Sequence, residues 1–86
     1  MKNRFPMPRV AHQSSVLAAT EYFPDLQTLD VVFTGGDVYR YSKVPLSLYR
    51  DLLEADSTGA FFNAHIRNQF PFQYIARSNA VSADAV

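Results

Sequence analysis

Hydrophobic and polar residues alternate most clearly between positions 29 and 41, where the sequence reads Leu-Asp-Val-Val-Phe-Thr-Gly-Gly-Asp-Val-Tyr-Arg-Tyr. Two runs rich in β-branched and aromatic residues flank a Gly-Gly pair, and this pattern predicts a β-hairpin. The register of the hairpin depends on the length of its loop. A two-residue turn at Gly35 and Gly36 would direct both tyrosines away from the face that holds Leu29, Val31 and Phe33.

The alternative loop contains three residues, 34–36, with Gly36 as the left-handed residue of a G1 bulge. This register places the apolar side chains and both tyrosines on one face, and it sets an acid opposite a base on the other face. Because a slip of one residue would undo this arrangement, burial should select this register, and we predict it. The predicted pairs are Leu29 with Tyr41, Asp30 with Arg40, and Val31 with Tyr39.

Weaker patterns surround the hairpin. Residues 15–23 alternate enough to predict a first strand, which ends in turn chemistry at Pro24 and Asp25. Residues 45–55 predict a helix that starts at Pro45 and carries one apolar stripe. The stripe consists of Leu46, Tyr49, Leu52 and Leu53.

A second helix is predicted after a break at residues 56–59. Ser57 can cap this helix by accepting a hydrogen bond from the backbone N–H of Ala60. We expect the helix to run to about residue 69, with Phe62 and Ile66 directed inward, and to stop before Pro71. Beyond it Phe70, Phe72 and Tyr74 alternate with other residues, which predicts an extended segment docked on the body of the domain.

These elements predict an α+β fold. It consists of a three-stranded antiparallel β-meander followed by two short helices packed on one face, with an extended C-terminal segment. We divide the chain into a mobile basic arm (1–13), a single domain (14–76) and a frayed tail (77–86).

Composition narrows the class of protein without identifying a partner. The 86 residues suffice for one modest core, and a formal net charge of zero gives no global attraction for nucleic acid or membranes. The absence of cysteine excludes disulfides and thiolate metal sites. No apolar run reaches membrane-spanning length, and prolines interrupt the region that a signal peptide would need, so we expect a cytoplasmic protein.

Catalytic signatures are missing from the sequence. His12 and His65 have no third ligand at metal-binding spacing, and the Ser14-Ser15 pair lacks a nucleophile elbow. No glycine pattern of the kind that cradles phosphate occurs. We therefore expect a protein that is not an enzyme and that has no metal or small-molecule cofactor.

The order of landmarks resembles the KTSC domain, a family named for its place at the carboxyl end of some lysyl-tRNA synthetases and also found as a free-standing small protein. The resemblance covers residues 14–75, nearly the whole body. It rests on Leu29-x-Val31-x-Phe33-x-x-Gly36, Tyr39-x-Tyr41, Val44-Pro45, Tyr49, Leu53-x-Ala55, Ser57-x-Gly59-x-x-Phe62-Asn63-x-x-Ile66-Arg67 and Phe70-Pro71-Phe72. Because the family occurs in lysyl-tRNA synthetases, the resemblance implies that this chain binds RNA, and we treat RNA binding as an expectation.

Five residues are candidates for binding nucleic acid: Tyr39, Arg40, Tyr41, Asn63 and Arg67. Aromatic residues two apart on a strand project together, so Tyr39 and Tyr41 either form a stacking platform for bases or lie in the core, and the predicted register favours the core. Asn63 and Arg67 share one helix face. They either grip a phosphate or base edge, or they hold a loop and pair with an acid of the first helix.

Two functions from different classes follow. The first is an RNA-binding accessory module that uses these five residues. The second is a protein-interaction module, in which an exposed hairpin edge or aromatic patch docks on a larger protein. The sequence alone does not decide between RNA and a larger protein as the partner.

Overall fold

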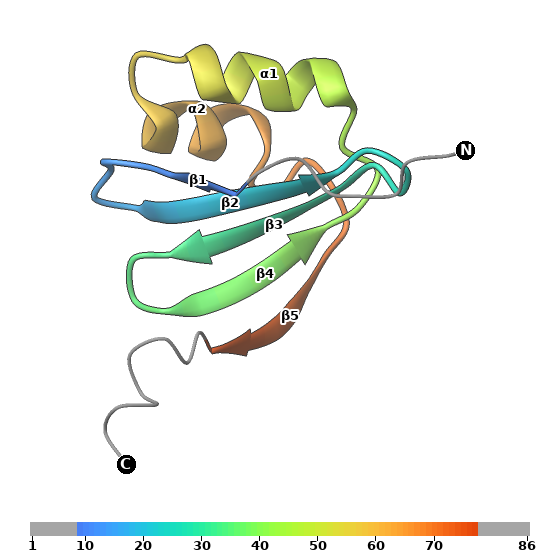
Figure 1. Ribbon diagram of the computed structural model, residues 1–86, viewed down its shortest axis with the longest axis horizontal. Helices are drawn as coiled ribbons and strands as arrows, with labels where there is room; N and C mark the ends of the chain where they lie inside the picture. Colours follow the sequence, from blue (N-terminus) through green and yellow to red (C-terminus); the bar gives the residue numbers. More distant parts are fainter. Residues whose placement is uncertain (1–8, 78–86) are drawn as a thin grey trace.

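The computed structural model describes residues 9–77, which form one antiparallel sheet and two helices (Figure 1). Residues 1–8 of the predicted arm and 78–86 of the predicted tail lie outside the described residues. The elements in chain order are β1 (Val10–Ala11), β2 (Leu17–Phe23), β3 (Thr28–Phe33), β4 (Asp37–Tyr41), α1 (Leu46–Glu54), α2 (Thr58–His65) and β5 (Phe72–Arg77).

The α+β class is confirmed, but the predicted number of strands is wrong. The described sheet has five strands in the order β1-β2-β3-β4-β5, with every neighbouring pair antiparallel. β1 lies within the predicted arm and is two residues long, too short to show any periodicity. β5 is the segment that we expected to be extended and docked, and it docks by pairing with β4 along the edge of the sheet.

The β3–β4 hairpin has the predicted register. Leu29 lies opposite Tyr41, Asp30 opposite Arg40, and Val31 opposite Tyr39. Gly36 has a φ of 106°, a left-handed conformation that favours glycine, and its N–H donates to the Phe33 carbonyl at 2.8 Å. Successive strand residues point to opposite faces, so Tyr39 and Tyr41 lie on the same face as Val31.

Both helices start where the sequence predicts. α1 begins directly after Pro45 and buries Tyr49 and Leu52 of its apolar stripe. The Ser57 side chain accepts a hydrogen bond from the Ala60 N–H at 3.2 Å, which caps α2. α2 ends at His65, earlier than predicted, because the chain turns over residues 66–69 before it reaches Pro71.

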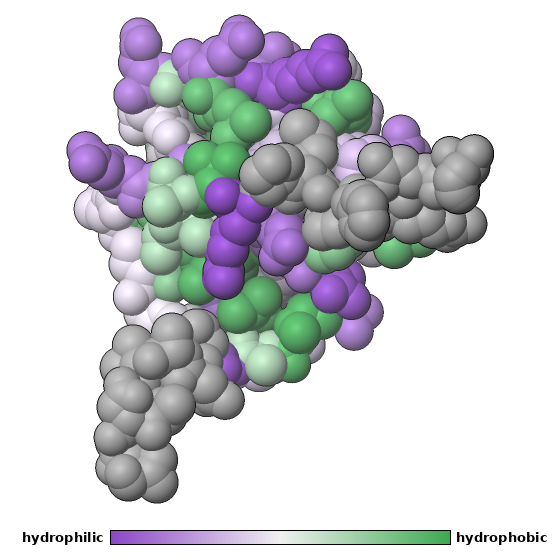
Figure 2. All heavy atoms as spheres, viewed as in Figure 1, coloured by the Kyte–Doolittle hydropathy of each residue, from purple (hydrophilic) through white to green (hydrophobic). Residues whose placement is uncertain are grey.

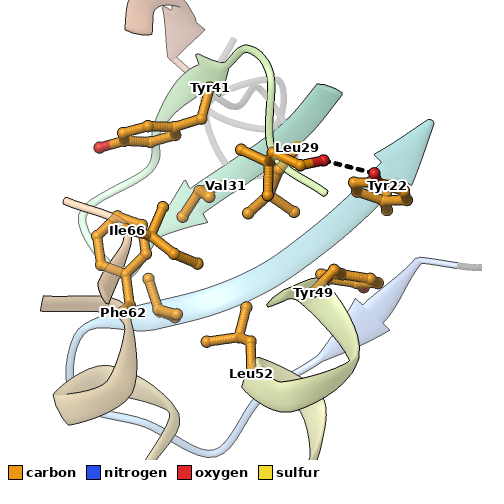
Figure 3. Close-up of a cluster of buried hydrophobic side chains, with 10 residues drawn as sticks. Tyr22, Leu29, Val31, Tyr41, Tyr49, Leu52, Phe62 and Ile66 are labelled. Carbon is orange, nitrogen blue, oxygen red and sulfur yellow. Dashed lines mark hydrogen bonds between the residues drawn. The ribbon is translucent and has the colours of Figure 1, made fainter. Parts of the chain in front are cut away.

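The core lies between the helices and the sheet. Figure 3 shows side chains of the strands directed toward those of the two helices. The rings of Tyr22 and Tyr49 stack with their centroids 5.0 Å apart, and the Tyr22 hydroxyl donates to the Val44 carbonyl (dashed line in Figure 3). The fully buried apolar residues include Leu17, Tyr22, Leu29, Val31, Val44, Tyr49, Leu52, Phe62 and Ile66.

The helices do not cover the whole sheet. In Figure 1 both helices lie on the side of β1 and β2, and β5 forms the edge farthest from them. The space-filling view shows apolar side chains in a band down the middle of the viewed face (Figure 2). Large apolar residues therefore reach solvent, and three of them, Phe72, Tyr74 and Ile75, come from β5.

Candidate functional site

Tyr39 and Tyr41 share a face of β4 but have different surroundings. Tyr41 is 3% exposed and meets the ring of Phe62 edge to face, with the centroids 5.5 Å apart. Tyr39 is half-buried and sits farther from the helices, among Phe33, Phe72 and Tyr74. The core interpretation therefore applies to Tyr41, whereas Tyr39 lies at the margin of the core.

β5 extends the aromatic face of β4. Phe72 lies opposite Tyr41, and Tyr74 lies opposite Tyr39, so all four rings project to the same side of the sheet. The ring centroids of Tyr41 and Phe72 are 5.5 Å apart, and those of Tyr39 and Tyr74 are 5.3 Å apart. Phe72 and Tyr74 are each 51% exposed, so aromatic surface is available to a ligand.

A pocket of about 370 Å³ opens over this face, and we call it the aromatic pocket. It lies where β4 and β5 approach the turn that follows α2. Its lining combines aromatic rings, one guanidinium, one carboxylate and one amide. The lining residues are Phe33, Asp37, Tyr39, Tyr41, Arg67, Asn68 and Phe72.

Arg67 supplies the positive charge of the aromatic pocket. Its Nη1 donates to the Asn63 amide oxygen at 3.0 Å, and both side chains are exposed. Among the described residues Arg67 forms no ion pair, so the alternative in which it pairs with an acid of the first helix is not observed there. Burial raises the pKa of the Tyr41 phenol, and the charge of Arg67 opposes this shift.

Asp37 supplies the negative charge of the pocket. Its Oδ1 accepts a hydrogen bond from the Tyr74 hydroxyl at 3.2 Å and lies 3.6 Å from Nη1 of Arg77. Partial burial and the Asp37 carboxylate raise the pKa of the Tyr74 phenol. Asp37 therefore has partners on β5, at the outer edge of the sheet.

Arg40 lies on the opposite face of the sheet. Its Nε and Nη2 donate to the two carboxylate oxygens of Asp30 at 2.8 and 3.0 Å, and this pairing raises the pKa of the Arg40 guanidinium. Of the five predicted candidates, the structure thus brings Tyr39, Tyr41 and Arg67 to one pocket and places Asn63 beside Arg67. Arg40 faces away from that pocket.

Besides Phe33, which was predicted only for the apolar face, sequence reasoning missed four residues of this site: Asp37, Asn68, Phe72 and Tyr74. A signal existed for the two aromatic residues, because Phe72 and Tyr74 alternate in the sequence and must share a face of any extended segment. No sequence pattern indicated Asp37 or Asn68, because the tertiary packing of the elements alone brings these residues to the pocket.

Within residues 9–77, no group of three or more His, Asp or Glu side chains could hold a metal ion. No helix in that part of the chain is long and apolar enough to cross a membrane. A second, polar pocket of about 450 Å³ lies between residues 13–16 and 56–60, with Asn63 in its lining.

Comparison with known proteins gives matches over most of the chain. A model described as the KTSC domain matches residues 13–70. An uncharacterised protein of Stutzerimonas stutzeri is 48% identical over 63 residues, which cover 73% of this chain and 89% of that protein. A lysine–tRNA ligase of a Nostoc species is 35% identical over 69 residues, which cover 80% of this chain and 12% of the ligase.

A solved structure matches as well. The crystal structure of a KTSC domain protein from Yersinia pestis has a TM-score of 0.77 and 29% sequence identity. The match covers 80% of this chain and 97% of that one. These matches agree with the resemblance that the sequence landmarks indicated.

Proposed function

The chain belongs to the KTSC domain family, and from this premise we propose that it is a small binding module that holds single-stranded RNA in its aromatic pocket. Its relatives include small uncharacterised proteins and lysine–tRNA ligases, of which it matches one part. The occurrence of the domain in a protein named for tRNA supports RNA as the class of ligand. Relatives that consist almost entirely of this domain support a module that acts by binding.

One observation carries the proposal: half-exposed aromatic rings lie beside a guanidinium that has no acidic partner among the described residues. Phe72 and Tyr74 present ring surface to solvent, and Arg67 lines the same pocket as Phe72. Single-stranded nucleic acids bind by stacking bases on aromatic side chains, and a guanidinium adds donors for a phosphate or a base edge. A structural core has no need of this combination, because core rings are covered.

The charges of the chain determine the type of RNA binding that is expected. A formal net charge of zero and one pocket cation allow few contacts with phosphates. The slope of log K against log salt should therefore be shallow, no steeper than about −1 for single strands. Stacking contributes roughly 1–3 kcal/mol per base, so it must supply most of the affinity.

The deciding experiment is a titration of fluorescently labelled single-stranded and duplex RNA at low and at moderate salt. We expect association with the single strand, and little with the duplex, whose bases are already stacked inside the helix. Phe72→Ala should weaken binding roughly 5- to 100-fold, the equivalent of one lost stack. Arg67→Ala should also weaken it, whereas the matched control Arg50→Ala, an exposed arginine of α1, should not.

The absence of any association at low salt would overturn the RNA proposal, since charge contacts are least screened there. An equal loss of RNA affinity in Arg67→Ala and Arg50→Ala would also count against the RNA proposal. Binding would then reflect the total charge of the chain and not the aromatic pocket.

A second candidate function rests on the edge of the sheet. β5 is the last strand of the described sheet, and all six of its residues are exposed. Such an edge can accept a strand from another protein, with main-chain hydrogen bonds supplying affinity. Ile75→Lys would place a charge on this edge, so it should abolish association with a protein and leave RNA binding intact. Arg67→Ala should instead weaken RNA binding and leave association with a protein intact.

A further inference from the structure

The aromatic pocket contains an acid as well as a base, and the two are not paired with each other. Arg67 donates to Asn63, while Asp37 is held by Tyr74 and Arg77 through its Oδ1 atom alone. The other carboxylate oxygen, Oδ2, accepts no hydrogen bond from any of the described residues. The Asp37 side chain is 42% exposed and lines the aromatic pocket, so a ligand in the pocket can reach the carboxylate.

A carboxylate is a poor component for a site that only grips the RNA backbone, because it repels phosphate. Asp37 is instead suited to accept hydrogen bonds from N–H groups, and Arg67 is suited to donate in a fork to two acceptors. A flat ligand between these side chains must therefore offer donors on one edge and acceptors on another. Aromatic walls on Tyr39 and Phe72 require that the ligand itself be a planar ring.

Guanine has this distribution of hydrogen-bonding groups, and the other RNA bases do not. Its N1–H and 2-amino groups form an edge with two adjacent donors, for which the available Oδ2 atom of Asp37 is an acceptor. Its O6 and N7 atoms form an edge with two acceptors, which is the usual target of arginine. Adenine and cytosine each place a ring acceptor beside their amino group, and uracil has a single N–H between two carbonyls.

We propose that the aromatic pocket selects guanine, with Asp37 on the edge that bears N1 and the 2-amino group and Arg67 on the O6 and N7 edge. This inference rests on the proposed RNA-binding function and deepens it from a class of polymer to a particular base. The pocket volume of about 370 Å³ lies near the lower end of the range for small-molecule sites, which suits one base and not several. Tyr74 and Arg77 act as positioning residues, because they hold Asp37 through one oxygen and leave the other available.

The test uses six-residue oligouridine strands that carry one central guanosine, inosine, adenosine or cytidine. Inosine differs from guanosine only in lacking the 2-amino group, so it isolates one contact with Asp37. We expect the guanosine strand to bind about tenfold tighter than the inosine strand, the scale of one well-formed base contact. In Asp37→Asn this ratio should fall to about one, because the amide presents a donor where the carboxylate presents an acceptor.

Asp51→Asn is the matched control, since Asp51 is an exposed acid of α1 that does not line the pocket. It should keep the preference for guanosine. If every strand binds equally well to the unchanged protein, RNA binding stands and the guanine inference is overturned. If Asp37→Asn tightens all four strands by the same factor, Asp37 acts only as a repelling charge, and the inference is again overturned. If no strand binds at all, both proposals fail.

Discussion

Two regions of the sheet use aromatic residues in opposite ways. In the covered region, which comprises β2, β3 and the end of β4 beneath the helices, Tyr22 and Tyr49 stack and are fully buried. In the open region, which comprises the rest of β4 and β5, Phe72 and Tyr74 each meet the ring of Tyr39 edge to face and remain half-exposed. The same residue types thus build a core in one place and a surface in the other.

The hydroxyl groups of the tyrosines show the same contrast. The Tyr22 hydroxyl donates to a backbone carbonyl, and the Tyr49 hydroxyl bonds to the buried Thr20 at 3.0 Å. The Tyr74 hydroxyl instead bonds to the partly exposed carboxylate of Asp37. Buried polar atoms must be satisfied within the protein, whereas an exposed group can exchange its partner for a ligand. Of these three hydroxyl groups, only that of Tyr74 can therefore exchange its partner for a ligand while the protein stays folded.

The largest expected difference between the two regions is in the stability lost when one tyrosine of each region is truncated to alanine. Tyr41→Ala should lower the free energy of unfolding by about 3–5 kcal/mol, because it leaves a cavity against Phe62 beneath the helices. Tyr74→Ala removes the same side chain from the surface and should cost about 1 kcal/mol or less. Urea denaturation measures both changes, provided that the m-value stays constant. Equal losses in the two variants would show that the open region is part of the core.

Replacing tyrosine by phenylalanine in each region compares the contribution of a single hydroxyl group to stability. Tyr22→Phe keeps the stacking on Tyr49 but leaves the buried Val44 carbonyl without its donor, at a cost of about 1–3 kcal/mol. Tyr74→Phe removes an exposed hydrogen bond and should change stability by no more than about 0.5 kcal/mol. Thermal unfolding of both variants is the measurement. A larger loss in Tyr74→Phe than in Tyr22→Phe would contradict the assignment of the two regions.

Most of the covered region follows from local patterns in the sequence. The hairpin register follows from the alternation of apolar residues and from Gly36, and the helix stripe and the Ser57 cap follow from spacing alone. β1 could not be predicted, because two residues carry no period and their pairing with β2 is a tertiary contact. The place of β5 beside β4 depends on the path of the chain after α2, which no local pattern specifies.

The aromatic pocket could be predicted only where its residues belong to local sequence motifs. Tyr39, Tyr41 and Arg67 belong to motifs that the sequence displays, and they meet at the aromatic pocket. Arg40 was named as a candidate, although the predicted register already paired it with Asp30 on the other face. The segment after Pro71 docks on β4 as predicted, but the exposure of Phe72 could not be predicted. Sequence alternation reports which residues share a face and not how much of that face another element covers.

The smallest expected effect on stability concerns His12, which follows β1 and connects this edge of the sheet to the core through a hydrogen bond. His12 Nε2 lies 2.8 Å from the Thr20 hydroxyl, which in turn bonds to the hydroxyl of Tyr49 on α1. Burial lowers the pKa of the His12 imidazole below its usual value, so folding favours the neutral ring. The resulting stability is fully present above the unfolded pKa of about 6.5 and is lost as the pH falls through the lower folded pKa.

Replacing His12 by Gln keeps a hydrogen-bonding side chain but removes this titration. The free energy of unfolding should therefore fall less in His12→Gln than in the unchanged protein between about pH 7.5 and pH 5. His65→Gln is the control, since it removes an exposed histidine of α2 and leaves His12 with its bond to Thr20 in place. Urea denaturation at several pH values gives the comparison, and carboxylate titration cancels because all three proteins share the same acids. Identical pH profiles for the unchanged protein and His12→Gln would show that β1 is not held through a neutral imidazole.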